Sequence, residues 1–347
     1  MKPVRYLSLI VSIVLLAGCA TTNGPSVGNN PQFAFQVEST TITRGLALDV
    51  WVDGNTAYVA DDQYGITVWD VTDLKHPVLI DSILTPERVK EIAYSPEAGL
   101  VIAMLPGFIT AYDRTTKALQ IQHGNGISNA FRYKVIPPDT LLLIEVEPDN
   151  DGCQFLFSYK DPLSNPQWTS DLHSFYAPVY GTLTSLELDS NYVYFAHGQH
   201  GITILKYDYM TIGPGFAPTV TGRINTPGLA QDLVISRDRN HVFVADNQSG
   251  LQVVDISDKT RPRIVGNSLP PNVNDAVRVR AYGDTAIFIE QFRGIYAVDC
   301  SNPASPHYFG TYASNDPQGL FIRESDKTIF LTDLDQGLII LKFRVNL

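Results

Sequence analysis

The segment HVFVADNQSGLQVVDISDKTRPRIVGN (241–267) contains the pattern that decides the fold. Two runs rich in Val, Ile and Phe flank a polar turn that ends in Gly250, and a third apolar run follows Pro262. Short alternating runs of this composition are typical of β-strands, and Gly, Asp and Asn are typical of the turns between them. The segment therefore predicts three successive strands.

The glycine-led run of this segment recurs along the whole chain. Seven glycines precede alternating apolar residues: Gly65, Gly107, Gly152, Gly201, Gly250, Gly294 and Gly337. Successive glycines are 42 to 49 residues apart. A period in the forties is typical of a β-propeller, in which each repeat forms a blade of four strands. The sequence predicts an all-β, seven-bladed propeller with four antiparallel strands, A to D, in each blade.

The last unit lacks its own outer strand D. The other units end in a proline-led strand, whereas the seventh glycine-led strand is followed only by the chain end near Asn346. Residues 33–41 (FAFQVESTT) form an otherwise unassigned strand at the beginning of the folded part. We predict that this segment supplies strand D of the last blade, because ring closure removes exposed strand edges.

Two units resemble the LVIVD-repeat family of bacterial propellers. Residues 56–82 and 241–267 share a YVAD-like strand, a GL-V-DVSD-like strand and a P-LVG-like strand with that family. The sixth unit is similar, and the other four match only in outline. The resemblance implies a propeller at the cell surface, usually with an interaction role, and it implies no catalytic residues.

The first nineteen residues indicate export. Lys2 and Arg5 precede an apolar run of about eleven residues, which is too short to span a bilayer. The run ends in LAGC (16–19), which resembles the lipobox of bacterial lipoproteins, so Cys19 is the expected lipidated residue. The alternative is an ordinary secretory signal. Ala20 stands where Asp would direct retention in the inner membrane, so the resemblance implies the outer membrane, facing the periplasm or the exterior.

These features divide the chain into three parts. Residues 1–18 form the expected signal peptide, residues 19–32 the lipidated cysteine and a flexible tether, and residues 33–347 a single propeller. The membrane is therefore an expected partner, reached through the N-terminal lipid.

Composition narrows the possible functions. The chain has 36 acidic and 25 basic residues, a net charge of −11, which becomes −13 without Lys2 and Arg5. This balance argues against a nucleic-acid partner, because phosphate neutralisation needs a basic face. Three cysteines rule out a disulfide scaffold. Cys153 and Cys300 fall in units three and six, so we expect two buried thiols with no bond between them.

The residues that end strand B form a repeated acidic position. The seven aligned residues are Asp61, Met104, Glu145, His197, Asp246, Glu290 and Asp333. The five carboxylates could bind a cation or a basic partner, or each could accept backbone N–H bonds in its own B–C turn. The repetition favours the structural role, so we predict neither a metal site nor a cofactor. Strand A also supplies charges, which could face the channel or lie between blades: Asp49, Glu91, Lys134, Glu187, Asp232, Arg278 and Arg323.

Units three and four carry extra length, in residues 161–178 and 207–218. These insertions contain seven large apolar or aromatic side chains: Trp168, Phe175, Tyr176, Tyr207, Tyr209, Met210 and Phe216. Such residues in surface loops are typical of binding hot spots, although they could instead cap neighbouring strands.

The sequence contains no recognisable catalytic motif. We therefore expect a non-catalytic scaffold that binds a protein or glycan in the cell envelope. A periplasmic or surface hydrolase or lyase, with a metal or acidic site at the channel mouth, is the alternative.

Overall fold

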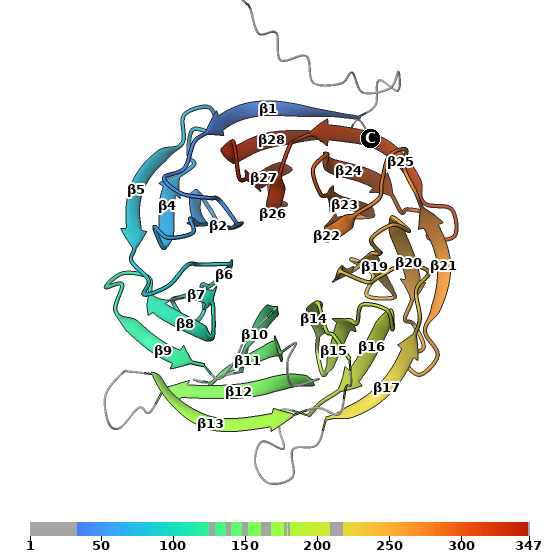
Figure 1. Ribbon diagram of the computed structural model, residues 1–347, viewed down its shortest axis with the longest axis horizontal. Helices are drawn as coiled ribbons and strands as arrows, with labels where there is room; N and C mark the ends of the chain where they lie inside the picture. Colours follow the sequence, from blue (N-terminus) through green and yellow to red (C-terminus); the bar gives the residue numbers. More distant parts are fainter. Residues whose placement is uncertain are drawn as a thin grey trace, which may run out of the picture.

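The computed structural model describes residues 33–124, 129–136, 140–147, 152–160, 168–176, 179, 181–208 and 218–345. They form seven four-stranded antiparallel sheets around a central channel (Figure 1), which confirms the predicted seven-bladed propeller. Within these ranges every regular element is a strand, and none of the described segments is a helix capable of crossing a bilayer. The expected signal peptide and tether lie outside the described residues.

Each blade follows the order A, B, C, D from the channel outwards. Blades 1 to 3 comprise β2 (Asp49–Asp53), β3 (Thr56–Ala60), β4 (Ile66–Asp70) and β5 (Val78–Ile83); β6 (Glu91–Ser95), β7 (Leu100–Leu105), β8 (Phe108–Asp113) and β9 (Leu119–His123); and β10 (Ala130–Ile136), β11 (Thr140–Glu147), β12 (Gly152–Lys160) and β13 (Trp168–Tyr176).

The remaining blades repeat this order, except that the last one ends in the first strand of the chain. Blades 4 to 7 comprise β14 (Ser185–Asp189), β15 (Tyr192–Ala196), β16 (Ile202–Lys206) and β17 (Thr219–Ile224); β18 (Asp232–Ile235), β19 (His241–Ala245), β20 (Leu251–Asp255) and β21 (Arg263–Ser268); β22 (Ala276–Tyr282), β23 (Thr285–Glu290), β24 (Gly294–Asp299) and β25 (His307–Ala313); and β26 (Pro317–Arg323), β27 (Thr328–Asp333), β28 (Gly337–Val345) and β1 (Phe33–Thr41).

The ring closes as the sequence predicts. Strand β1 pairs antiparallel with β28, from Phe33 opposite Val345 to Thr41 opposite Leu338, with a bulge between Val37 and Ser39. The first and last strands of the propeller thus share one sheet, and they lie side by side in Figure 1. Closure therefore depends on a segment more than 290 residues away in sequence from its partner strand.

The hydrophobic core is divided among the blade interfaces. Seven apolar clusters each join two neighbouring blades; one, for example, packs Tyr58 and Val68 of blade 1 against Ile92 and Val101 of blade 2. Strands B and C are buried on both faces and are therefore almost continuously apolar, whereas an outer strand such as β5 is exposed or half-buried along most of its length.

The motif glycines are required by backbone geometry. Gly250 has φ of 68°, and a Cβ atom there would lie 2.6 Å from the carbonyl oxygen of Ser268. Gly65 and Gly337 also have positive φ, of 77° and 75°, and a Cβ atom at either would lie 2.4 Å from a carbonyl oxygen at the end of strand D of the same blade. Only glycine meets both requirements without strain, which explains why this residue begins strand C in repeat after repeat.

Candidate functional site

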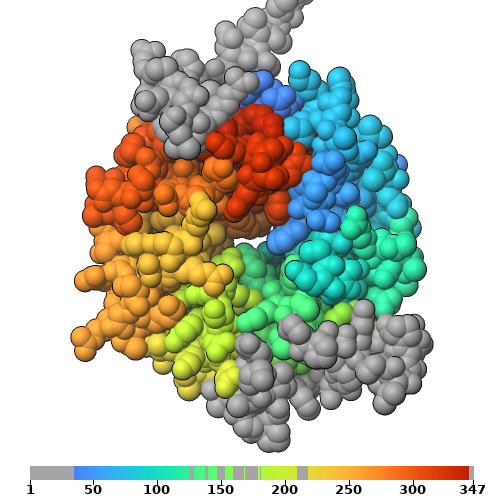
Figure 2. Space-filling model, turned by 180° about the vertical axis from the view of Figure 1, so that it is seen from behind, coloured from blue at the N-terminus to red at the C-terminus, as the bar shows by residue number. Residues whose placement is uncertain are grey.

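The propeller has two different rims. We call the side that carries the B–C turns and the D-to-A crossovers the crossover rim, and the side that carries the A–B and C–D turns the hairpin rim. Strands A run from the crossover rim to the hairpin rim, so their first residues lie near the crossover rim. The central opening between the rims is visible in the space-filling view (Figure 2).

Four of the predicted acidic residues hold the crossovers in place. Asp61 accepts N–H bonds from Arg44 and Gly45. Equivalent contacts link Asp246 to Gly228 and Thr226, Glu290 to Asn274 and Asp275, and Asp333 to Ser314 and Asp316. All four side chains are buried. The donors come mainly from the preceding crossover and not, as we predicted, from the B–C turn; only Asp333 also accepts from its own turn, at Asp335 and Gln336.

The predicted alignment of the third blade was wrong by two residues. Glu145 lies inside β11, opposite Phe131 and Gln154, and it is buried with His123 at 3.4 Å. The residue opposite the motif glycine Gly152 is Glu147. A shift of two keeps a residue on the same face of a strand, so the apolar pattern of β11 alone could not reveal the error.

Two of the predicted binding aromatics belong to the core. Trp168 begins β13, the outer strand of blade 3, and packs into the cluster between blades 2 and 3. Tyr207 is fully buried, lies in a tilted ring contact with Phe155 with centroids 5.6 Å apart, and donates a hydrogen bond to the carbonyl of Ser190. Neither side chain is available to a partner, because each fills space between strands.

The other predicted hot-spot residues lie in β13 or outside the described residues. Phe175 and Tyr176 lie at the end of β13, so part of the first insertion is a strand and not a loop. Tyr209, Met210 and Phe216 lie outside the described residues.

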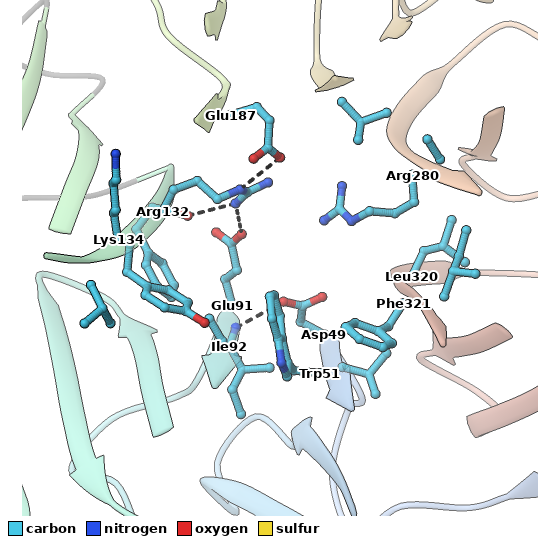
Figure 3. Close-up of a pocket in the computed structure, with 18 of the residues that line it drawn as sticks. Asp49, Trp51, Glu91, Ile92, Arg132, Lys134, Glu187, Arg280, Leu320 and Phe321 are labelled. Atoms are coloured by element: carbon cyan, nitrogen blue, oxygen red, sulfur yellow. Dashed lines mark hydrogen bonds and ion pairs between the residues drawn. The ribbon is translucent and has the colours of Figure 1, made fainter. Parts of the chain in front are cut away.

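Charged side chains of strands A meet in the channel. Arg278 contacts Asp49 at 2.8 Å and Arg280 contacts Asp232 at 2.9 Å. In a second group of ion pairs, Arg132 lies between two carboxylates, with Glu91 at 3.0 Å and Glu187 at 3.5 Å (Figure 3). We call these seven residues the channel charge ring. Its members come from blades 1 to 6, and with all seven groups ionised its four acids and three arginines carry one excess negative charge.

Sequence reasoning found five members of this ring and missed two arginines. Arg132 lies two residues before Lys134, and Arg280 two residues after Arg278, so each arginine shares the strand face of a residue already selected. Arg323, in contrast, lies outside the ring: it pairs with Asp326 and donates to the carbonyl of Gly54.

Burial governs ionisation in the ring. Burial raises the pKa of Glu91 above its ordinary value, against the opposing effect of the Arg132 charge. Burial also acts to raise the pKa of Asp232, but Arg280, Arg132 and Arg278 hold it below its ordinary value. The pKa values of these two acids therefore shift in opposite directions.

Cavities lie on both sides of the ring. The larger one, of about 700 Å³, is lined by the hairpin-rim halves of strands A, including Trp51, Tyr133 and Phe321, and by every member of the ring except Asp232 and Arg278. The smaller one, of about 70 Å³, lies towards the crossovers. Figure 3 shows Arg280 extending into the large cavity, opposite Arg132 and Glu187. The large cavity is within the usual size range of small-molecule sites.

The crossover rim exposes large apolar side chains. Eight of the twelve large hydrophobic residues exposed in the described structure lie on it: Ile42, Leu46, Tyr64, Leu84, Phe108, Leu229, Leu269 and Phe292. Several occupy equivalent places in different blades, since Ile42, Leu84 and Leu269 each follow a strand D directly. Leu84 is 81% exposed and Ile42 69%. We call these eight residues the rim hydrophobic set.

The described cysteines and histidines form no reactive centre. Cys153 and Cys300 are buried in different blades and are not joined by a disulfide, as we predicted. Burial raises the pKa of the Cys300 thiol to about 12, which keeps it protonated. The rings of His197 and His200 lie 4.8 Å apart. Across the described ranges, no three His, Cys, Asp or Glu residues are grouped as metal ligands would be.

Comparison with known families agrees with the repeat pattern. The model of the LVIVD repeat matches residues 44–85, 227–269 and 275–314. This chain carries LVIVD repeats. Each matched segment begins in a crossover and ends just after a strand D, so one LVIVD repeat corresponds to one blade, here blades 1, 5 and 6. These are the units whose sequences resemble the family most closely. None of the curated proteins matches the chain.

Proposed function

We propose that this LVIVD-repeat propeller is a non-catalytic scaffold that binds a protein partner on its crossover rim and is anchored to the outer membrane through lipidated Cys19. The rim hydrophobic set carries the proposal. Exposed apolar residues that gather on one face of a soluble ring are typical of protein-interaction sites.

The composition of the set favours a protein over a glycan. Five of its eight members are Leu or Ile, which pack against apolar side chains but offer no flat face to a sugar ring. Nearby charges are partly engaged within the chain, as Arg88 lies 3.6 Å from Asp62 and Arg293 lies 3.8 Å from Glu290. The partner we expect therefore presents an apolar surface to this rim, with polar groups at its edge.

The position of the first strand places the attachment point of the tether on one side of the propeller. Phe33 pairs with Val345, and both lie at the hairpin rim. A tether that joins the chain at Phe33 leaves the propeller on the side opposite the rim hydrophobic set. A lipid at Cys19 would therefore hold the hairpin rim towards the membrane and direct the crossover rim towards the aqueous space.

Binding can be tested with the chain from residue 20, which retains every described residue. The protein would be used to capture partners from envelope extracts, and a captured protein would be purified and rebound. Leu84→Asp and Leu269→Asp should each weaken rebinding at least tenfold, because each places a charge in the proposed interface.

Ile80→Asp provides the matched control. Ile80 belongs to the same blade as Leu84 and is also largely exposed, but it lies on the outer strand β5. Equal losses from Ile80→Asp and Leu84→Asp would contradict a site on the crossover rim. Binding of a purified glycan, with loss in Leu84→Asp, would assign the rim to a different class of partner.

Anchoring and catalysis need separate measurements. Cys19→Ala should release the exported protein from the membrane fraction, and continued partitioning with membranes would contradict lipidation. Metal analysis of the purified soluble chain addresses the hydrolase alternative. Stoichiometric calcium or zinc that is lost in both Asp61→Ala and Asp246→Ala would favour the enzyme.

A further inference from the structure

The large cavity on the hairpin-rim side of the channel charge ring is a candidate binding site that is separate from the rim hydrophobic set. Arg280 extends into it, and among the described residues its guanidinium donates only through Nη1, to Asp232 and to the carbonyl of Val279. The Nε and Nη2 groups of Arg280 have no acceptor among the described residues. This edge of a guanidinium is the one that binds a planar carboxylate through two parallel hydrogen bonds.

The acceptors beneath the cavity are already engaged. Asp49 accepts from Arg278 through one oxygen and from the backbone N–H of Ile92 through the other. Glu187 accepts from Arg132 and from the backbone N–H of Leu188. The cavity therefore offers free N–H donors on Arg280, whereas most of its carboxylate oxygens already accept hydrogen bonds. A ligand that fits this cavity should supply hydrogen-bond acceptors.

The walls of the cavity suit a flat apolar body. Trp51 and Phe321 lie against each other from neighbouring blades, with ring centroids 5.3 Å apart. Tyr133 lines the same cavity and donates its hydroxyl to the carbonyl of Tyr94, which leaves its ring as the contact surface. Aromatic side chains of this kind pack against planar ligands by offset or edge-on contacts.

We propose that this cavity binds a small organic monoanion that joins one carboxylate to a flat apolar body, with the carboxylate on the Nε–Nη2 edge of Arg280 and the body against Trp51 and Phe321. A dianion such as a phosphate monoester fits less well. Glu91 and Glu187 also line the cavity, and the channel charge ring already has one excess negative charge.

Three probes that share the same naphthalene ring system and differ in charge test this assignment. Isothermal titration calorimetry at neutral pH would compare 1-naphthaleneacetate with the neutral 1-naphthaleneacetamide and the cationic 1-naphthalenemethylamine, using the chain from residue 20. We expect the carboxylate to bind at least about tenfold more tightly than either analogue. Tighter binding of the amine, or no saturable binding of the carboxylate at millimolar concentrations, would overturn the proposal.

Arg280→Gln and Arg278→Gln form a matched pair of variants. Both arginines lie on β22, both side chains are 24% exposed, and both pair with a buried aspartate, but only Arg280 lines the large cavity. Arg280→Gln should weaken binding of the carboxylate about tenfold and leave the amide unchanged, whereas Arg278→Gln should keep the affinity within about threefold. Equal effects of the two variants would overturn the assignment.

Two further variants keep the test decisive if a lost ion pair prevents folding. Arg280→Lys retains a positive charge beside Asp232 but removes the two-pronged edge, so carboxylate binding should still weaken severalfold. Trp51→Leu should weaken the binding of all three probes, because it removes the aromatic side chain that contacts their naphthalene ring system. Unchanged carboxylate affinity in Arg280→Lys together with unchanged affinity in Trp51→Leu would contradict the proposed placement.

Discussion

Phe35, on the first strand, lies directly opposite Phe343 on the last strand, with ring centroids 5.3 Å apart. Phe343 also lies 6.0 Å from Phe309 of blade 6. The aromatic group therefore joins the two ends of the propeller and fixes the closed blade to its neighbour. Side-chain packing therefore stabilises the closed ring together with the backbone hydrogen bonds between β1 and β28.

Removal of this packing should destabilise the whole ring. Phe343 is buried, so Phe343→Ala should lower the free energy of unfolding by about 3–5 kcal/mol, as measured by urea denaturation. Val37→Ala is the control, because Val37 lies exposed on the same first strand and should cost less than about 1 kcal/mol. Deletion of residues 33–41 should abolish the cooperative transition, and an unchanged melting profile would refute closure by β1.

The buried carboxylates of the crossover rim should contribute to stability. Asp246→Ala leaves the Gly228 N–H and the Thr226 hydroxyl without their acceptor, so it should cost about 2–3 kcal/mol in urea denaturation. Asp258→Ala removes two similar hydrogen bonds to Thr260 at an exposed turn, so it should cost clearly less than Asp246→Ala. Similar costs at the two positions would argue against a structural role for the acidic rim.

Two glycines with positive φ should respond differently to alanine. A Cβ atom at Gly250 would meet the Ser268 carbonyl oxygen at 2.6 Å, whereas one at Gly54 would have no neighbour within 4 Å. Gly54→Ala should therefore cost about 1–2 kcal/mol from backbone strain alone. Gly250→Ala adds a steric term and should cost about 2–4 kcal/mol. Thermal unfolding of both variants would detect a reversal of this order.

Acid sensitivity should depend in part on Asp255. The Ser257 hydroxyl donates to Asp255 at 2.6 Å, and this bond, with smaller contributions from the Ser257 N–H and Arg263, lowers the pKa of Asp255 from 3.8 to about 2. Because the folded pKa is the lower one, the stabilisation is present above about pH 4 and is lost as the pH falls towards about 2.

Asp255→Asn should therefore reduce the loss of stability between pH 4 and pH 2. The measurement is the urea midpoint of both proteins across this range. Parallel pH profiles for Asp255→Asn and the unmodified chain would contradict the assignment to this carboxylate.

The repeat allowed the fold to be predicted from the sequence. Gly250 and its equivalents mark the start of strand C because the backbone there needs positive φ and no Cβ, a constraint that acts locally and therefore leaves a visible pattern. Alternating apolar runs reveal strands for the same reason. Even the closing strand could be predicted, because one outer strand was missing at one end and an extra strand was present at the other.

The candidate sites were less accessible to sequence reasoning. The sequence suggested that Trp168 and Tyr207 are exposed hot spots, but both are buried. The burial of a side chain depends on which strand packs over it, and this packing cannot be inferred from the local sequence. Arg280 was missed because it shares a strand face with Arg278, and only the position along the channel distinguishes the two. The rim hydrophobic set was also missed, since its members are scattered from residue 42 to residue 292.

The sequence by itself determined the seven-bladed ring, its closure and the turn chemistry of each blade, because these follow from interactions within one repeat or from the count of strands. Tertiary structure alone decided which arginine of β22 faces the large cavity and which apolar residues gather on the crossover rim. The physical reason is that a closed ring brings equivalent positions of distant repeats to one radius and one face. Proximity at the axis and on the rims is therefore a property of the assembled blades and not of any single repeat.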